Sequence, residues 1–183
     1  MLGVQATEAS QDGTLSRSFD RLPHRGPDGW HDVSAVGIKP SPAFPLGRNA
    51  IIAHVGDSRA YLFRDQALRQ LTRDHTFAQT LRDVGVPAEK TEQYRHLLVN
   101  SFGARPEDVK IDVDHVPLED GDRLLLCSDG LTDMVTDAEI TSTLVEVAGA
   151  QAACDALIER ALHNGGKDNV TVLVADLDVA RES

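Results

Sequence analysis

The sequence predicts an α+β domain in which short strands come first and paired helices come late. Short apolar runs in the first part of the regular region are joined by turns of two or three residues, and such connections cannot form the crossovers of a parallel sheet. Two segments with helical spacing then precede a final apolar strand. The sequence contains no internal repeat and no Walker or dinucleotide-binding fingerprint, which argues against a βαβ nucleotide fold.

Length and charge narrow the function classes. The chain has 183 residues, enough for one domain with a real core. It carries 29 acidic and 18 basic side chains, a formal charge of −11, which argues against a nucleic-acid surface. Carboxylates are the hard oxygen ligands that Mg²⁺ and Mn²⁺ prefer, so a divalent-metal site is compatible with this charge. For most of these carboxylates, solubility is the better interpretation.

The two cysteines, Cys127 and Cys154, both lie among apolar residues, so we expect buried free thiols. Without a Cys-x-x-Cys pair, a zinc site or redox motif has no support. The N-terminus lacks the pattern of a signal peptide, and no apolar run approaches the roughly 20 residues that span a bilayer. These features predict a soluble, cytoplasmic protein with no membrane partner.

Residues 1–48 differ in character from the rest. They hold five of the eight prolines and show no helical or strand periodicity over residues 1–35. Such a segment buries too little apolar area to offset the entropy of ordering it. We expect an irregular, poorly ordered segment with one short strand before Ala50.

Regular patterns begin at Asn49. Residues 50–55 are expected to form a buried strand, and the turn at Gly56 leads into a returning strand at 60–63, which makes a hairpin. A further turn leads to a third strand at 67–72. These three strands are predicted to form an antiparallel meander.

The middle of the chain mixes short helices and strands. Phe77, Leu81 and Val84 are spaced for one helical face over 76–84, and Gly85 is suited to end that helix. The elements expected next are a short helix at 87–94, strands at 96–102 and 109–114, and a central strand at 123–127.

Two helices and a strand complete the predicted domain. Thr136 and Glu139 fit a capping box that opens a helix. Its inward residues are expected to be Ile140, Leu144, Val145 and Val147. A second helix over 151–163 should face inward with Ala153, Leu157, Ala161 and Leu162. The glycines at 165–166 end it, and residues 170–175 form the last strand.

Three acidic residues, Asp57, Asp129 and Asp168, lie in glycine-containing turns beside predicted strands. Acids held at strand ends can converge at one end of a sheet and form a site for a hard metal ion. Glycines beside them permit tight turns and close approach of the backbone. Each acid alone is better interpreted as turn chemistry, but their joint occurrence favours a metal site.

Four motifs in order give the pattern specificity: VGDSRAYLFRD, LTRDH, GDRLLLCSDGLTDMV and GGKDNVTVLV. Residues 49–176 thereby resemble the PPM (type 2C) family of metal-dependent Ser/Thr protein phosphatases. The resemblance implies a sandwich of two antiparallel sheets flanked by helices. It also implies a dinuclear Mn²⁺ or Mg²⁺ centre, at which a metal-bridging water attacks the phosphorus of phosphoserine or phosphothreonine.

The resemblance also implies roles for individual residues. Asp129 and Asp168 match ligands of the dinuclear centre, and Asp57 matches the acid that joins Asp129 in holding a third, weaker ion. The supporting neighbours are Gly56, Ser128, Gly130 and Asn169.

Other polar residues of the matched motifs carry weaker expectations. The Asp74–His75 pair is expected to be structural. Asp133 is either a group behind the ligands or an acid favoured by a helix start. Residues 76–102 match the family's helix-plus-flap region, which contributes to substrate choice.

Motifs of the family's first half are absent from the sequence: a phosphate-binding Arg, a Glu-Asp pair and Asp-Gly-x-Gly-Gly. The only earlier Asp-Gly pairs begin at Asp12 and Asp28, and we interpret both as loop turns. The expected fold is therefore a partial αββα sandwich over 49–177 that lacks the N-terminal half, followed by a tail at 178–183. The chain is expected to be a fragment, the product of a truncated or frameshifted gene, or a degenerate member.

Three alternative functions are compatible with this sequence. The first is hydrolysis of phosphoserine and phosphothreonine in phosphorylated proteins, the substrates of a Ser/Thr kinase. The second is a pseudophosphatase or fragment acting as an interaction module, motivated by the absent motifs. The third, a generic α+β domain without metal, requires the four motif matches to be coincidence.

Overall fold

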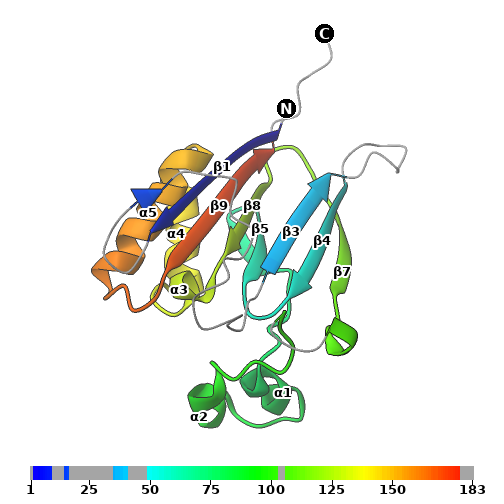
Figure 1. Cartoon of the computed structure of the whole chain (residues 1–183). Helices are drawn as coiled ribbons and strands as arrows, with labels where there is room; N and C mark the ends of the chain where they lie inside the picture. The colour runs from blue at the N-terminus through cyan, green and yellow to red at the C-terminus, as the bar shows by residue number, and fades with distance from the viewer. Residues whose placement is uncertain (1, 10–14, 17–34, 41–48, 103–105, 178–183) are drawn as a thin grey trace.

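A computed structural model of the chain describes residues 2–9, 15–16, 35–40, 49–102 and 106–177. The elements form three layers, with helices α4 (Asp137–Glu146) and α5 (Ala150–His163) covering one face of a six-stranded sheet and a three-stranded sheet facing the other (Figure 1). This confirms the expected α+β sandwich of two antiparallel sheets flanked by helices. In the described ranges, no helix combines the length and apolar character needed to cross a bilayer.

The six-stranded sheet has the order β2-β1-β9-β8-β5-β6, and every neighbouring pair is antiparallel. Its strands are β1 (Leu2–Ala9), β2 (Leu15–Ser16), β5 (Arg59–Arg64), β6 (Ala67–Gln70), β8 (Arg123–Cys127) and β9 (Val170–Leu177). The three-stranded sheet has the order β3-β4-β7 and is also antiparallel. Its strands are β3 (Ala35–Pro40), β4 (Asn49–Val55) and β7 (Asp112–Pro117).

Shorter helices lie at the end of the sheets that carries the candidate site. They are α1 (Phe77–Asp83), α2 (Ala88–Thr91), α3 (Asp129–Thr132), and the 3₁₀ turns at Glu92–Tyr94 and Pro106–Asp108. Thr76 caps α1, since its side chain accepts a hydrogen bond from the Gln79 backbone. The predicted capping box of Thr136 and Glu139 is present at the start of α4.

Strand periodicity divides the core between the two layers. Along β8, Leu125 and Cys127 face the helices, whereas Leu124 and Leu126 face the three-stranded sheet. All four are buried, which explains why this strand reads as an unbroken apolar run. The central position predicted for 123–127 is confirmed, because β8 lies between β9 and β5.

The predicted hairpin between residues 50–55 and 60–63 is wrong. β4 and β5 belong to different sheets, and they pack face to face through residues such as Ile52 and Leu62. The turn between them crosses from one sheet to the other at Gly56, whose φ of 100° is open to glycine. The second hairpin, β5 to β6, is confirmed, and its turn residues Asp65 and Gln66 both have positive φ as a two-residue hairpin turn requires.

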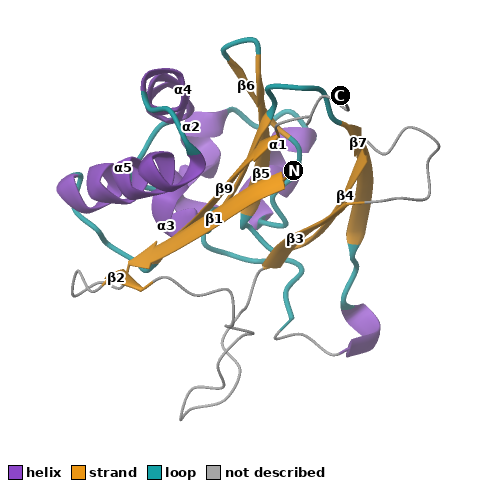
Figure 2. Cartoon of the chain, turned by 90° about the horizontal axis from the view of Figure 1, so that it is seen from above, coloured by secondary structure: helices purple, strands orange, loops and turns teal. Residues whose placement is uncertain are grey.

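The prediction of irregular structure with only one short strand before Ala50 is wrong, because three strands are described there. β1 pairs along its whole length with β9, from Leu2 opposite Leu177 to Ala9 opposite Val170, and β3 pairs with β4 (Figure 2). Single-sequence periodicity misses such strands because the backbone of a neighbouring strand supplies their hydrogen bonds. The remainder of the segment, including Asp12 and Asp28, lies outside the described residues.

Three local predictions also need correction. Residues 96–102 form no strand apart from one isolated bridge between Thr76 and Leu98, and the strand predicted at 109–114 begins only at Asp112. Val84 and Val145, expected to face inward, are 75% and 48% exposed. Helical spacing identifies an apolar stripe, but the packing of neighbouring elements decides which part of it is covered.

The buried centre of β8 yields a stability prediction. Leu125→Ala should lower the free energy of unfolding by about 2–5 kcal/mol, because Leu125 is fully buried and its removal leaves a cavity against the helical layer. Urea unfolding followed by circular dichroism measures the change. The half-exposed Val145→Ala is the control and should change stability by less than about 1 kcal/mol. Equal losses in the two variants would contradict this assignment of the core.

Candidate metal centre

The three predicted acids meet at one end of the six-stranded sheet. Arg59 pairs with Cys127, and Cys127 pairs with Val172, so the start of β5, the end of β8 and the start of β9 are level. Asp57 precedes β5, Asp129 follows β8, and Asp168 precedes β9. Antiparallel register therefore delivers three acids from distant parts of the sequence to the same edge.

Close backbone packing fixes Asp129 against the turn that carries Asp168. Gly130, buried in α3, lies so near Asn169 that a Cβ at this position would overlap the Asn169 carbonyl oxygen and come within 2.9 Å of its carbon. Ser128 bonds the same turn twice, because its hydroxyl donates to the Asn169 carbonyl at 3.2 Å and accepts from the Thr171 backbone at 3.0 Å. The expected supporting residues thus hold the start of α3 against the start of β9.

The turn that carries Asp57 is held by His75. The His75 backbone N–H donates to the Gly56 carbonyl at 2.8 Å, and the Gly56 N–H donates to the His75 ring at 3.1 Å. Asp74 accepts hydrogen bonds from the Arg59 guanidinium at 2.9 and 2.6 Å. These contacts agree with the structural role expected for the Asp74–His75 pair.

Electrostatics show that the carboxylates crowd one another. The pKa of Asp129 is raised to about 6, first by burial and then by repulsion from Asp57, Asp168 and Asp133. A cluster of carboxylates that disfavours its own ionisation is a donor set that a divalent cation would stabilise. The residues present therefore fit a Mn²⁺ or Mg²⁺ ion.

One group of possible metal ligands at this site differs from the predicted trio. Among the described residues, ligand atoms of His96, Asp129 and Asp133 lie within 4.8 Å of one another. Asp57 and Asp129 line one cavity of about 150 Å³ that also includes His96 and Asp133. Asp168 is exposed and accepts a hydrogen bond from its neighbour Asn169 at 2.7 Å. The three acids thus lie close enough for Asp57 and Asp168 to interact electrostatically with Asp129. Asp168, however, is not among the residues that line the cavity.

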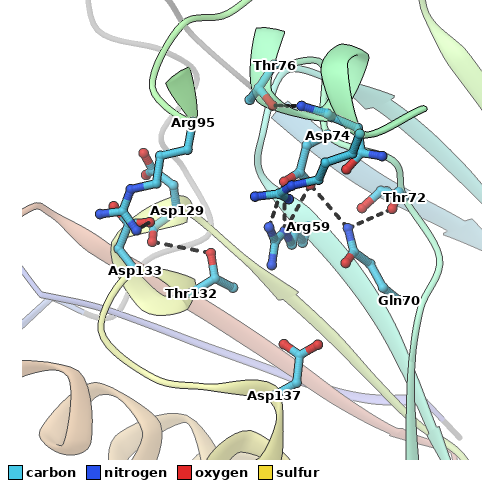
Figure 3. A network of polar contacts seen from close by, with 12 residues as sticks. Arg59, Gln70, Thr72, Asp74, Thr76, Arg95, Asp129, Thr132, Asp133 and Asp137 are labelled. Carbon is cyan, nitrogen blue, oxygen red and sulfur yellow. Dashed lines mark hydrogen bonds and ion pairs between the residues drawn. The ribbon is translucent and has the colours of Figure 1, made fainter. Parts of the chain in front are cut away.

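The positively charged side chain of Arg95, in the helix-plus-flap region, lines this cavity. Arg95 lies 3.2 Å from Asp133 and 3.0 Å from Glu92, and Figure 3 shows its side chain directed toward Asp133 beside Asp129. Sequence reasoning missed both Arg95 and His96, since nothing in their local pattern separates them from ordinary surface residues. Asp133, for which two roles were open, caps the end of α3 and lines the cavity.

Comparisons with known proteins agree with this geometry. The family model described as Stage II sporulation protein E matches residues 67–178, and that described as Protein phosphatase 2C matches residues 8–81. The serine/threonine phosphatase PstP of Mycobacterium tuberculosis has a crystal structure that superposes with a TM-score of 0.70 at 38% identity. The chain belongs to the PPM (type 2C) family of protein phosphatases. Mn²⁺ or Mg²⁺ is the cofactor of that family, and a PstP catalytic domain has been solved with two manganese ions.

Other PPM relatives show the extent of the match. The Listeria monocytogenes serine/threonine phosphatase stp is 34% identical over 154 residues, which cover 82% of this chain and 61% of that protein. The alignment with M. tuberculosis PstP covers 81% of this chain and 61% of the solved chain. The Mycobacterium smegmatis phosphatase MsPP, solved with cacodylate, has a TM-score of 0.71 at 32% identity, with coverage of 80% and 62%. The chain therefore spans about three-fifths of the length of these PPM phosphatases.

The contact between α3 and β9 can be tested by adding one methyl group. Gly130→Ala should lower the free energy of unfolding by about 1–3 kcal/mol, because the new Cβ overlaps the Asn169 backbone, which no side-chain rotation can relieve. Thermal unfolding measures the loss. Ala138→Gly is a control for helical propensity at the exposed start of α4 and should cost about 1 kcal/mol or less. A Gly130→Ala protein as stable as wild type would contradict the close packing.

Carboxylate repulsion predicts a pH-dependent gain in stability. Asp129→Asn should stabilise the metal-free chain by roughly 1–2 kcal/mol above pH 6, after allowance for solvent screening. The pKa of Asp129 is about 6 in the folded chain and 3.8 ordinarily, so ionisation opposes folding above the folded pKa. The gain should shrink between pH 6 and 4 and vanish below. Urea unfolding across pH measures it.

The matched control is Glu146→Gln, which removes an exposed carboxylate of α4 far from the cluster and should give no such profile. A gain from Asp129→Asn that persists unchanged at pH 3.5 would contradict the role of repulsion.

Proposed function

We propose that this chain supplies the metal-binding aspartates found in the C-terminal portion of a protein serine/threonine phosphatase domain. In this proposal the enzyme hydrolyses phosphoserine and phosphothreonine with two Mn²⁺ or Mg²⁺ ions. The observation that carries the proposal is the convergence of three acids, Asp57, Asp129 and Asp168. The carboxyl group of Asp129 lies among the others, and its pKa is raised to about 6. Membership of the PPM family supports the reaction class, and the relatives' names as serine/threonine phosphatases support the substrate class.

In this proposal Asp129 and Asp168 hold the dinuclear centre, and Asp57 joins Asp129 at a third, weaker ion. When bound, the two ions supply an activated water and neutralise charge on the phosphoryl oxygens. The protein's contribution is orientation: Gly130 and Ser128 keep Asp129 against the turn of Asp168. This rigid backing fixes the carboxylate separations that metal affinity depends on.

Arg95 gives the cavity a group that suits a phosphate. It is a partly buried guanidinium held between two carboxylates, Glu92 and Asp133, at the cavity wall. An incoming phosphoryl group would compete with Asp133 for this guanidinium, since Arg binds phosphate with paired hydrogen bonds. Phosphorylated proteins, the products of a Ser/Thr kinase, are the proposed partners.

A binding module without turnover is the second candidate. It is favoured by the position of Asp168, which is exposed and is not among the residues that line the cavity of Asp57 and Asp129. Such a module would bind Mn²⁺ weakly through Asp129 and Asp168 and retain affinity for a phosphoprotein or a kinase.

One assay separates these candidates. The purified chain is incubated with a phosphothreonine peptide, with and without millimolar Mn²⁺. We expect Mn²⁺-dependent phosphate release that falls to the metal-free rate in Asp129→Ala, because this variant removes the carboxylate that interacts with Asp57, Asp168 and Asp133. Glu146→Gln is the control and should keep wild-type activity. A folded chain that binds Mn²⁺ yet releases no phosphate would support the binding module instead.

A further inference from the structure

The imidazole of His75 lies at the centre of a buried network behind the Asp57 turn. The residue is only 7% exposed. It binds Gly56 from both sides, through its own backbone N–H to the Gly56 carbonyl and through its ring Nδ1, which accepts from the Gly56 N–H. Because Gly56 has a φ of 100° and immediately precedes Asp57, these two bonds fix the peptide that aims the Asp57 side chain.

The neighbours of the ring determine where its proton lies. Nδ1 is 2.9 Å from the Asn100 amide nitrogen, and Asn100 is itself oriented by Lys110, whose N–H donates to Oδ1 and whose carbonyl accepts from Nδ2. Nδ1 therefore faces two donors and must be the unprotonated nitrogen. Nε2 then carries the proton and donates to Asp112 at 2.9 Å.

This tautomer decides between two roles for the cluster. Ligand atoms of His54, His75 and Asp112 lie within 4.8 Å of one another, a spacing that could suit a cation. A cation at Nε2 of His75 would need the proton to move to Nδ1, where it would oppose the N–H groups of Gly56 and Asn100. A cation site is therefore disfavoured, and the ring serves as a structural connector.

His54 reinforces the connector from the neighbouring strand. Its ring lies 4.7 Å from the His75 ring, centroid to centroid, and it is 3% exposed. Neither ring nitrogen of His54 makes a hydrogen bond of ordinary geometry to the described residues, although the Ser58 backbone lies near enough to raise its pKa slightly. Burial, followed by His75, lowers the pKa of His54 overall, so a neutral ring packs against the connector.

We propose that His75 is a positioning residue that sets the metal affinity of Asp57 and joins it to the helix-plus-flap region. The inference rests on the proposed function, in which Asp57 is a metal ligand. One imidazole connects the Gly56–Asp57 turn, β7 through Asp112, and Asn100, which follows the segment that carries Arg95. The turn of Asp57, which lines the cavity, and the segment that follows Arg95 are thus linked through one side chain that does not itself line the cavity.

Two substitutions divide the contacts of the ring. His75→Asn keeps an oxygen near the position of Nδ1, able to accept from the Gly56 N–H, but it is too short to reach Asp112. His75→Gln places an amide N–H near the position of Nε2, able to donate to Asp112, but it leaves the Gly56 N–H without its acceptor. Asp112→Asn is the matched control, because its amide oxygen can still accept from Nε2.

Mn²⁺ binding by calorimetry and the Gly56 amide signal in ¹H–¹⁵N spectra are the readouts, with thermal unfolding to compare stabilities. We expect His75→Gln to weaken Mn²⁺ binding by about tenfold or more and to shift the Gly56 signal. His75→Asn and Asp112→Asn should keep both near wild type. A merely structural role would instead weaken binding in proportion to lost stability in all three variants.

The outcomes separate this inference from the proposed function. If wild type binds Mn²⁺ and Asp57→Asn weakens binding but His75→Gln does not, the positioning role is overturned and the metal site stands. If wild type binds no Mn²⁺, the metal site is overturned, and the positioning role toward it falls as well. A Gly56 signal that is unchanged by His75→Gln in the metal-free chain would overturn the contact itself.

Discussion

The approach of Gly130 to the Asn169 carbonyl is the contact on which the candidate site depends. It allows the start of α3 to lie directly on the start of β9, so that Asp129 and Asp168, 39 residues apart in the sequence, interact electrostatically. Bringing these acids together is unfavourable electrostatically, because the pKa of Asp129 is raised first by burial and then by repulsion from Asp57, Asp168 and Asp133. It persists because the strands on either side belong to a continuous sheet with a buried apolar face on each side.

The packing of the sandwich explains how the repulsion between these carboxylates is tolerated. β8 and β9 contribute alternate side chains to both apolar layers, so a displacement of either strand would disturb the helical layer and the layer between the sheets together. The cost of moving the acids apart is therefore set by burial throughout the core, which outweighs repulsion among a few partly solvated carboxylates. A cation would remove this repulsion, so metal binding at the proposed site would also stabilise the fold.

Local signals let the sequence predict much of this structure. The capping box at Thr136, the central apolar strand and the hairpin of β5 and β6 follow from residues close together. Partnerships between distant segments were not predictable: β4 looks like the partner of β5 but joins another sheet, and β1 becomes a strand only because β9 offers its edge. Arg95 escaped notice because its position depends on where the helix-plus-flap region folds.

The candidate site repeats this division. Glycine-flanked acids can be recognised from sequence because tight turns need particular residues, so Asp57 and Asp129 were predicted and do line one cavity. Their supports have no local signature. The role of His75 follows only from the direction of three hydrogen bonds, two of them from donors that fix Nδ1 as an acceptor. The tautomer distinguishes a connector from a metal ligand, since the same residue types at the same spacing would serve either purpose.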